Sequence, residues 1–149
     1  MGIIGVIGGS QVSSEIYRLA YEVGREIGKR GHILVNGGLS GVMEASAKGA
    51  KEEGGLVVGI LPGHSKESAN PWVDIPVVTG MGEARNVIIV RTADVLIAID
   101  GRYGTLSEIA FALVFGKPVI GLRTWECDFP IIRVETPGQA VEEAEKFLK

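Results

Sequence analysis

Residues 2–10 read GIIGVIGGS, an apolar run that ends in two glycines and a serine. A run of this kind is typical of a buried strand that feeds a tight loop. Apolar side chains then recur at helical spacing from Ser13 or Ser14, both suitable N-cap residues, and Gly31 stands where a C-cap glycine belongs. This part of the chain therefore predicts a strand, a glycine loop and an amphipathic helix.

The same order of strand, glycine loop and helix recurs twice. A predicted strand at 32–35 is followed by the loop NGGLSG, in which Ser40 is placed to cap a helix over 41–53. A predicted strand at 95–99 is followed by the loop DGRYG and a helix over 105–115. The chain thus contains three similar units.

The remaining segments are expected to add strands and a last helix. Four further strands are expected, at residues 56–61, 73–78, 118–122 and, as a short edge strand, 129–134. The polar segment 62–71 is the longest irregular stretch, and the periodicity of 85–91 does not distinguish a helix from a strand. Thr136 begins the sequence TPGQ, a capping box with proline at the first helical position, which predicts a final helix that runs to Leu148.

Apolar strands that alternate with amphipathic helices imply crossover connections and a sheet that is covered on both faces. We therefore expect a Rossmann-like, doubly wound α/β fold with a mainly parallel sheet, forming one domain over residues 1–149. Hydrophobic residues make up 46% of the chain and charged residues 22%, as in ordinary globular proteins. Glycine accounts for 22 of 149 residues, about twice its usual share of ~7%, which indicates tight turns and close backbone approaches.

Charge and residue counts exclude several classes of protein. The net charge of −3 is spread along the chain, and no cluster of Lys and Arg is present, so a nucleic-acid partner is not expected. A single Cys127, with only His32 and His64, excludes a disulfide framework and a zinc site built from several thiolates, and favours the cytoplasm. No residue cluster requires a metal or redox cofactor. No apolar run of about 18 residues indicates a membrane span.

The three glycine loops predict where a ligand binds. In doubly wound sheets ligands bind beyond the carboxyl ends of the strands, and these loops enter helix N-termini, which attract anions. We therefore expect a phosphorylated ligand, although each set of glycines could instead serve only a tight turn. The expected phosphate contacts are Gly8, Gly9, Ser10, Gly37, Gly38, Ser40, Gly41, Gly101, Gly104 and Thr105.

Known nucleotide and hydrolase motifs are missing from these loops. The chain has no G-x-x-x-x-G-K-[ST] motif, and Gly5 and Gly8 have the wrong spacing for G-x-G-x-x-G. The second predicted strand ends in Asn36 rather than in an acidic residue that would bind an NAD ribose. Neither Ser10 nor Ser40 stands in a G-x-S-x-G nucleophile elbow. A P-loop ATPase, a dehydrogenase and a serine hydrolase are thus disfavoured.

Three longer motifs together resemble the LOG family: GGLSGVMEA at residues 37–45, MGEARN at 81–86 and GRYGTLSE at 101–108. This family contains phosphoribohydrolases that release the base from cytokinin nucleoside monophosphates. The likeness covers residues 2–122, and ILPG at 60–63 with TGMGEARN at 79–86 is similar to the compact branch that includes the molybdenum cofactor carrier proteins, with DNA-processing protein A as a further relative. The resemblance implies a Rossmann-like fold and a nucleotide or the molybdenum cofactor as ligand.

The resemblance also implies roles for individual residues. Arg85 and Glu108 match the two residues that the LOG enzymes require for catalysis, and the loop that ends in Thr105 matches their 5′-phosphate site. The enzymes typically read P-G-G before that loop and R-K after the methionine, whereas this chain has IDG at residues 99–101 and RN at 85–86. Taken from the residues alone, Glu108 could complete a capping box with Thr105, and Arg85 could be a solvated surface side chain.

Further pocket residues have two readings each. Asp100 could contact a ribose hydroxyl or simply start its loop, and Arg102 and Tyr103 could face the ligand or only solvent. Met43 and Met81 could belong to the core or to the pocket wall, and His64 could serve proton transfer or be polar surface. A carboxylate such as Glu108 could stabilise the positive charge that develops on a sugar when its bond to a base breaks, and Arg85 could hold phosphate.

The sequence thus supports three functions in order of preference. The first is a protein that binds a nucleotide or another phosphorylated small molecule without turnover, because the IDG and RN departures weaken the match to the enzymes. The second is a nucleoside 5′-monophosphate phosphoribohydrolase, and the third is single-stranded DNA binding. The apolar segments 85–91 and 105–115 also predict a homodimer or a higher homo-oligomer.

Overall fold

The computed structural model describes residues 1–126 and 128–148, so Cys127 lies outside the described residues. The strands are β1 (Ile3–Gly8), β2 (Ile33–Asn36), β3 (Leu56–Leu61), β4 (Ile75–Val78), β5 (Val95–Ile99), β6 (Val119–Leu122) and β7 (Ile132–Arg133). The helices are α1 (Ser14–Lys29), α2 (Val42–Glu52), α3 (Asn86–Thr92), α4 (Tyr103–Val114) and α5 (Pro137–Glu145), with 3₁₀ turns η1 (Lys66–Ser68) and η2 (Gly82–Arg85). Among these helices none is long and apolar enough to cross a membrane.

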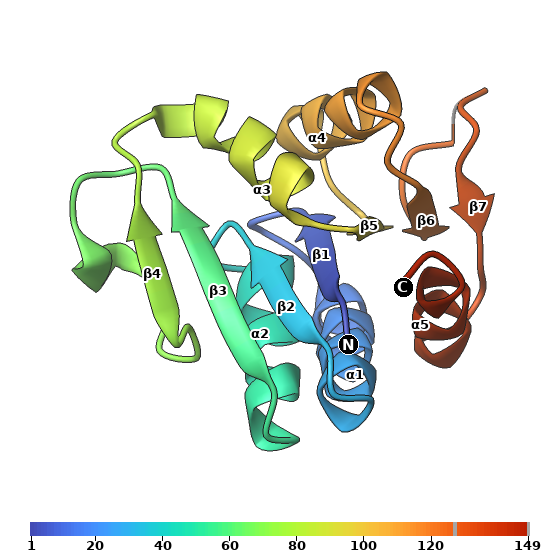
Figure 1. Ribbon diagram of the computed structural model, residues 1–149, viewed down its shortest axis with the longest axis horizontal. Coiled ribbons are helices and arrows are strands. Elements are labelled where there is room, and N and C mark those ends of the chain that lie inside the picture. Colours follow the sequence, from blue (N-terminus) through green and yellow to red (C-terminus); the bar gives the residue numbers. More distant parts are fainter. Residues whose placement is uncertain (127, 149) are drawn as a thin grey trace.

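The strands form one seven-stranded sheet in the order β4-β3-β2-β1-β5-β6-β7, and every neighbouring pair is parallel. Helices α1, α2 and α5 cover one face of the sheet, and α3 and α4 cover the other (Figure 1). The Rossmann-like α/β fold expected from the sequence is therefore confirmed. The strand order reverses direction at β1, which pairs with both β2 and β5, so the switch point of the sheet lies there.

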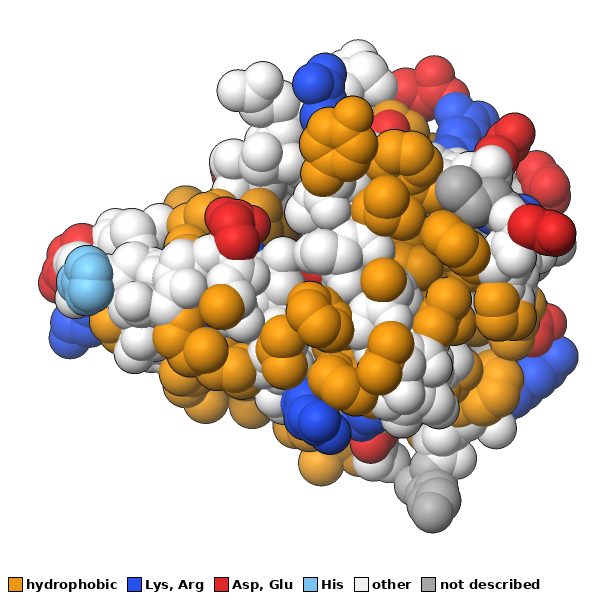
Figure 2. Space-filling view, turned by 90° about the horizontal axis from the view of Figure 1, so that it is seen from above, with side chains coloured by type: hydrophobic (Ala, Val, Ile, Leu, Met, Phe, Trp, Pro, Cys, Tyr) orange, Lys and Arg blue, Asp and Glu red, His pale blue; other side chains and the backbone are white. Residues whose placement is uncertain are grey.

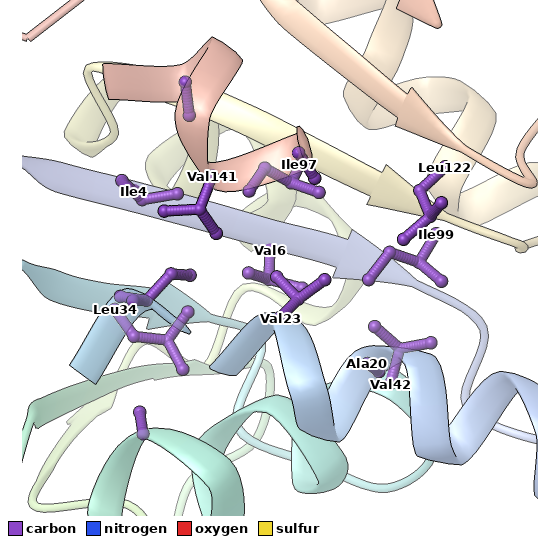
Figure 3. Packing of buried hydrophobic residues seen from close by; sticks show 14 of the residues in the cluster. Ile4, Val6, Ala20, Val23, Leu34, Val42, Ile97, Ile99, Leu122 and Val141 are labelled. Atoms are coloured by element: carbon purple, nitrogen blue, oxygen red, sulfur yellow. The ribbon is translucent and has the colours of Figure 1, made fainter. Parts of the chain in front are cut away.

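Side chains along each strand point alternately to the two faces of the sheet, so the hydrophobic core has two halves. In β5, Val95, Ile97 and Ile99 face α1, α2 and α5, whereas Leu96 and Ala98 face α3 and α4. Figure 3 shows the first half, where side chains of β1 and β5 meet those of α1 and α5. Because side chains of a strand alternate between its two faces, a strand covered on both sides must be apolar throughout. All five residues of β5 are accordingly buried.

Helices α1 and α2 pack at glycine positions. A Cβ placed on Gly24 of α1 would lie 2.0 Å from the backbone oxygen of Ser46, and a Cβ on Gly49 of α2 would lie 2.1 Å from the backbone oxygen of Tyr21. Such separations are far shorter than any real contact, so the two backbones approach as closely as they do only because these side chains are missing. Part of the high glycine content thus serves packing between helices and not loops.

Several expected element boundaries differ from the structure. The segment that periodicity left undecided forms the turn η2 followed by the short helix α3. The strand expected at 73–78 pairs only from Ile75, and the edge strand expected at 129–134 pairs only at Ile132–Arg133. The last helix ends at Glu145 rather than at Leu148, although hydrogen-bonded turns continue to Leu148.

The role expected for Ser40 is wrong. The residue before α2 is Gly41, which makes no side-chain cap, and the Ser40 hydroxyl instead donates to the backbone oxygen of Ser10 at 3.0 Å. The first backbone N–H of the helix, that of Val42, donates to the oxygen of Gly9 at 2.9 Å. The loop after β1 therefore caps α2, because the two loops lie side by side at the carboxyl edge of the sheet.

Candidate functional site

A cavity of about 310 Å³ lies beyond the carboxyl ends of β1, β2 and β5, at the switch point of the sheet. Its walls come from the three glycine loops, from η2 and from the first turns of α4. Nine of the residues expected to bind the ligand line it: Gly8, Gly9, Ser10, Gly37, Arg85, Asp100, Gly104, Thr105 and Glu108. The topology thus brings together residues that are far apart in the sequence. A volume of this size suits a small-molecule ligand.

Six of the expected residues are not in the lining: Gly38, Ser40, Gly41, Met81, Gly101 and Tyr103. Gly38 and Gly41 have positive φ values of 77° and 66°, which glycine adopts without strain. The Gly38 N–H donates to Asn36 Oδ1 at 2.8 Å, and a Cβ on Gly41 would lie 2.3 Å from the oxygen of Gly9. These glycines shape the second loop and hold it against the first.

Gly101, Tyr103 and Met81 are also outside the lining. Gly101 has a φ of 107°, and a Cβ there would lie 2.3 Å from the Thr105 side-chain oxygen. The Tyr103 side chain is 80% exposed and its ring lies 6.2 Å from that of Trp125, while Met81 is also exposed. Arg102 of the same loop, for which the sequence had left both readings open, lines the cavity.

Met43, for which the pocket wall was one of two readings, also lines the cavity. Other lining residues had no place in the expected site: Val6, Ile7, Gln11, Leu39, Glu83 and Asn86. Asn86 carried a usable signal, since it directly follows Arg85. Its Oδ1 accepts from Arg85 Nη1, and its Nδ2 donates to the Ser107 hydroxyl at 3.3 Å, so it links that arginine to α4. Val6 and Ile7 belong to a strand that is apolar for packing reasons, and nothing in its pattern marks them as a cavity wall.

The Arg85 guanidinium is buried, with the residue only 5% exposed, so the alternative reading of Arg85 as a solvated surface side chain is wrong. Its Nε donates to the backbone oxygen of Ile60 at 2.8 Å, and its Nη1 lies 3.8 Å from Glu83 Oε2 in addition to the Asn86 bond. Its Nη2 adjoins Gly37, where a Cβ would lie 2.8 Å away, and has no acceptor among the residues that the structure describes. One nitrogen of a buried cation is thus left for a ligand.

The Glu108 side chain is also buried, with the residue 7% exposed, and its carboxyl makes no hydrogen bond within the described residues. Removal from water raises the pKa of this carboxyl to about 8, with the positive charge of Arg85 opposing the shift and Glu83 adding to it. Helix α4 begins at Tyr103, with Arg102 as its N-cap, so Thr105 cannot be the N-cap of a capping box. The capping interpretation of Glu108 is therefore wrong.

Helix α4 presents its N-terminus to the cavity. The backbone N–H groups of Tyr103, Gly104 and Thr105 have no acceptor in the described part of the chain, and the last two of these residues line the cavity. The first turn of a helix carries partial positive charge and unsatisfied donors. A phosphate could thus bind between these N–H groups and Arg85 Nη2, with Glu108 one turn along the same helix. Within residues 1–126 and 128–148, no group of three His, Cys, Asp or Glu side chains could hold a metal ion.

This fold and this cavity define a Rossmann-like α/β protein with a small-molecule pocket at the switch point of its sheet. The chain belongs to the SLOG cluster4 family, whose model matches residues 1–147.

Two relatives are similar to this chain along most of its length. An uncharacterized protein of Archaeoglobus fulgidus is 54% identical over 143 residues, which cover 93% of this chain and 91% of that protein. A cytokinin riboside 5′-monophosphate phosphoribohydrolase of Mycobacterium tuberculosis is 34% identical over 125 residues, which cover 78% of this chain and 67% of that one. The resemblance to the LOG family is thereby confirmed.

Solved structures extend the likeness to the compact branch. The molybdenum cofactor binding protein of Rippkaea orientalis is 36% identical, with a TM-score of 0.93 over 99% of this chain and 98% of that one. The molybdenum cofactor carrier protein of Chlamydomonas reinhardtii is 34% identical, with a TM-score of 0.89 over 99% and 98% of the two chains. DNA processing protein A of Streptococcus pneumoniae, at 18% identity and a TM-score of 0.79 over 99% and 62%, shares the fold.

Proposed function

We propose that this protein binds a phosphorylated small molecule, a nucleotide or the molybdenum cofactor, in the cavity at the switch point, and holds it without turnover. The observation that carries the proposal is Arg85, a buried cation whose Nη2 has no acceptor within the described residues. A buried charge is costly unless it is well paired, and the ion pair of Arg85 with the exposed Glu83 is long, at 3.8 Å, so an anion beside Nη2 would supply a closer partner. The free N–H groups at the start of α4 lie at the same cavity.

The solved relatives support the carrier function over the enzyme. The similar structures from Rippkaea orientalis and Chlamydomonas reinhardtii are a molybdenum cofactor binding protein and a molybdenum cofactor carrier protein, and each matches nearly the whole of this chain. Asn86 occupies the position where the enzymes typically carry lysine, and it hydrogen-bonds to Arg85 instead of adding a positive charge. We place this function in the cytoplasm, which the single cysteine of the sequence favours.

Replacement of Arg85 tests the proposal. Because a hydrogen bond to a charged group is worth about 1.5–3 kcal/mol, Arg85→Gln is expected to weaken binding by about 10- to 100-fold. Isothermal titration with AMP and with a phosphorylated pterin measures the change. Arg18→Gln, at an exposed arginine of α1, is the matched control and is expected to leave the affinity unchanged. The proposal fails if wild type binds no probe, or if a folded Arg85→Gln protein binds as tightly as wild type.

A second candidate function is hydrolysis of the bond between ribose and base in a nucleoside 5′-monophosphate. The observation that favours it is Glu108, a carboxyl group that lines the same cavity as Arg85 without a hydrogen bond inside the described residues. Once ionised, it could stabilise positive charge on the sugar or orient a water molecule. The relative from Mycobacterium tuberculosis is a phosphoribohydrolase by name, which supports this candidate.

Incubation with AMP distinguishes the two functions. If the protein is a hydrolase, chromatography detects free adenine, and Glu108→Gln abolishes its release while AMP still binds. Only ionised Glu108 could stabilise a cationic sugar, and burial raises its pKa to about 8, so turnover would rise with pH up to that value. Binding with no adenine released at any pH supports the carrier function.

Single-stranded DNA binding ranks last among the candidates. At 18% identity, the likeness to DNA processing protein A extends to the fold alone. The net charge of −3 gives little attraction to a phosphate backbone.

We also propose that the chain forms a homodimer through the face that α3 and α4 cover. Figure 2 looks down on this face and shows hydrophobic side chains gathered over much of it. On α4, Val114 is 76% exposed and Phe111 is 37% exposed. Apolar surface of this kind marks an interaction site, and a second copy with the same patch would cover it symmetrically.

A further inference from the structure

Asp100 has an unusual backbone conformation at the edge of the cavity. It follows the last residue of β5, and its φ of 53° lies in the left-handed region that side chains other than glycine rarely adopt. Two hydrogen bonds hold it there: its N–H donates to the oxygen of Arg123 at 3.0 Å, and the Thr124 hydroxyl donates to its oxygen at 2.9 Å. A strained residue that neighbours hold in place is typical of functional sites.

The Asp100 carboxylate projects over the glycine loop that follows β1. It lines the cavity, and a Cβ placed on Gly9 would lie 3.3 Å from its Oδ2. No side-chain hydrogen bond or ion pair of Asp100 occurs within residues 1–126 and 128–148, and the free N–H groups of α4 do not donate to it. The carboxylate therefore has no structural partner that would explain why aspartate and not glycine stands at this strained position.

The chemistry of a carboxylate limits what it can bind. An ionised carboxylate accepts hydrogen bonds and donates none. An ionised phosphate likewise only accepts, and it carries the same sign of charge, so the two groups repel each other. Asp100 therefore does not contact phosphate, and the readings that the sequence left open for it, a ribose contact or the start of its loop, are the ones to decide between. The phosphate group of the ligand would bind to Arg85 and to the N–H groups at the start of α4. Asp100 would then face a part of the ligand that donates hydrogen bonds. Two adjacent hydroxyl groups match the two oxygens of a carboxylate.

We propose that Asp100 accepts hydrogen bonds from the sugar hydroxyl groups of the ligand, so that the pocket selects a ribose 5′-phosphate unit over its deoxy counterpart. This inference rests on the proposed function, since it concerns the same bound molecule. It narrows the class of ligand to ribonucleotides. It also gives a physical reason for the conformational strain at Asp100, because glycine would relieve the strain but could not contact the sugar.

The test is an isothermal titration of the full chain with AMP, 2′-deoxyAMP and 3′-deoxyAMP. Wild type is expected to bind AMP at least about tenfold more tightly than one of the deoxy compounds, because a hydrogen bond to a charged acceptor is lost. Asp100→Asn and Asp100→Gly are expected to bring the three affinities close together while 2′-deoxyAMP still binds. Both residues tolerate positive φ, so both variants should fold, and Asp100→Gly should melt no lower than wild type.

Each other outcome overturns the inference in a distinguishable way. Equal wild-type affinities for the three nucleotides contradict it and leave the proposed function standing. The inference is also contradicted, and the proposed function still stands, if both substitutions weaken the binding of all three nucleotides equally. Asp100 would then have a role in loop structure alone. Binding of a phosphorylated pterin but of no nucleotide also overturns the ribose inference alone. If no phosphorylated probe binds wild type, the proposed function fails and this inference fails with it.

Discussion

Glu108 is a carboxyl group that folding removes from water without giving it a hydrogen bond within the described residues. Burial raises its pKa from 4.5 to about 8 in the folded protein. Between these two values the folded chain binds a proton that the unfolded chain has released. The free energy of unfolding therefore decreases as pH rises from about 4.5 to 8, since ionised Glu108 favours the unfolded state.

Glu108→Gln should remove this part of the pH dependence. Its amide stays neutral, so relative to wild type the variant gains stability as pH rises from 5 to 8.5, by at most about 4 kcal/mol for a pKa that rises from 4.5 to about 8. Urea denaturation at the two pH values measures the difference. Glu126→Gln, at an exposed residue, is the control and should keep the wild-type pH dependence. Identical pH dependence in wild type and Glu108→Gln would show that Glu108 is not buried as a carboxyl.

The same buried residues explain why the site costs stability. Arg85 and Glu108 lie in one cavity, yet no salt bridge of 4.0 Å or less joins them in the described part of the chain. Within those residues neither buried group thus neutralises the other at close range. A phosphate beside Arg85 would add a negative charge near Glu108, and would therefore favour the protonated form of that carboxyl.

Among the secondary-structure elements, α1 and α2 depend most directly on glycine. The 2.0 Å between a Cβ on Gly24 and the Ser46 backbone oxygen means that any larger residue must move one helix away from the other. Because the loop after β1 connects to α1 and caps α2, this movement would also reach the cavity.

Gly24→Ala is expected to destabilise the protein by about 2–3 kcal/mol, because added volume in a close-packed contact displaces backbone. Chemical denaturation followed by circular dichroism measures the loss. Gly138→Ala in α5 is the matched control: a Cβ there meets nothing within 4 Å, and alanine in a helix should gain about 0.4–1 kcal/mol. Equal effects of the two substitutions would contradict the close contact of α1 and α2.

At the scale of the whole molecule, the two faces of the sheet are covered unequally. Three helices cover one face and two cover the other, where α3 has only seven residues. The edge strand β4 also keeps Ile75, Val77 and Val78 exposed. Apolar area that one chain cannot cover by itself is the physical basis for the proposed homodimer.

The dimer is testable by sedimentation. Wild type at micromolar concentration is expected to sediment at about twice the chain mass of 15.8 kDa. Val114→Glu places a charge in the proposed interface and should give the single-chain mass, with an unchanged circular dichroism spectrum. Phe147→Glu, an exposed apolar position beyond α5, is the control and should leave the wild-type mass. A wild-type mass near 16 kDa would refute the dimer.

The fold class, and the edge of the sheet where the cavity lies, could be predicted from the amino-acid sequence. Those features depend on local patterns: an apolar run such as residues 3–8, a glycine loop and a helix with one apolar face each follow from neighbouring residues. The three repeats of that order imply parallel strands, and parallel strands place their carboxyl ends at one edge. Arg85 and Glu108 came from motif resemblance, and the structure places both in the cavity.

Which polar groups at that edge are free depends on contacts between distant segments. The N–H of Val42 is used by Gly9, and the Ser40 hydroxyl donates to Ser10, so α2 is capped by a distant loop. The sequence could not reveal this, because each partner lies some thirty residues away. Burial likewise depends on what packs around a residue, and it made Glu108 a group with a raised pKa rather than a helix cap. The Asp100 side chain lies beside Gly9 with no hydrogen bond to another described residue. The fold is thus encoded locally, whereas the chemistry of the pocket arises from contacts between distant segments.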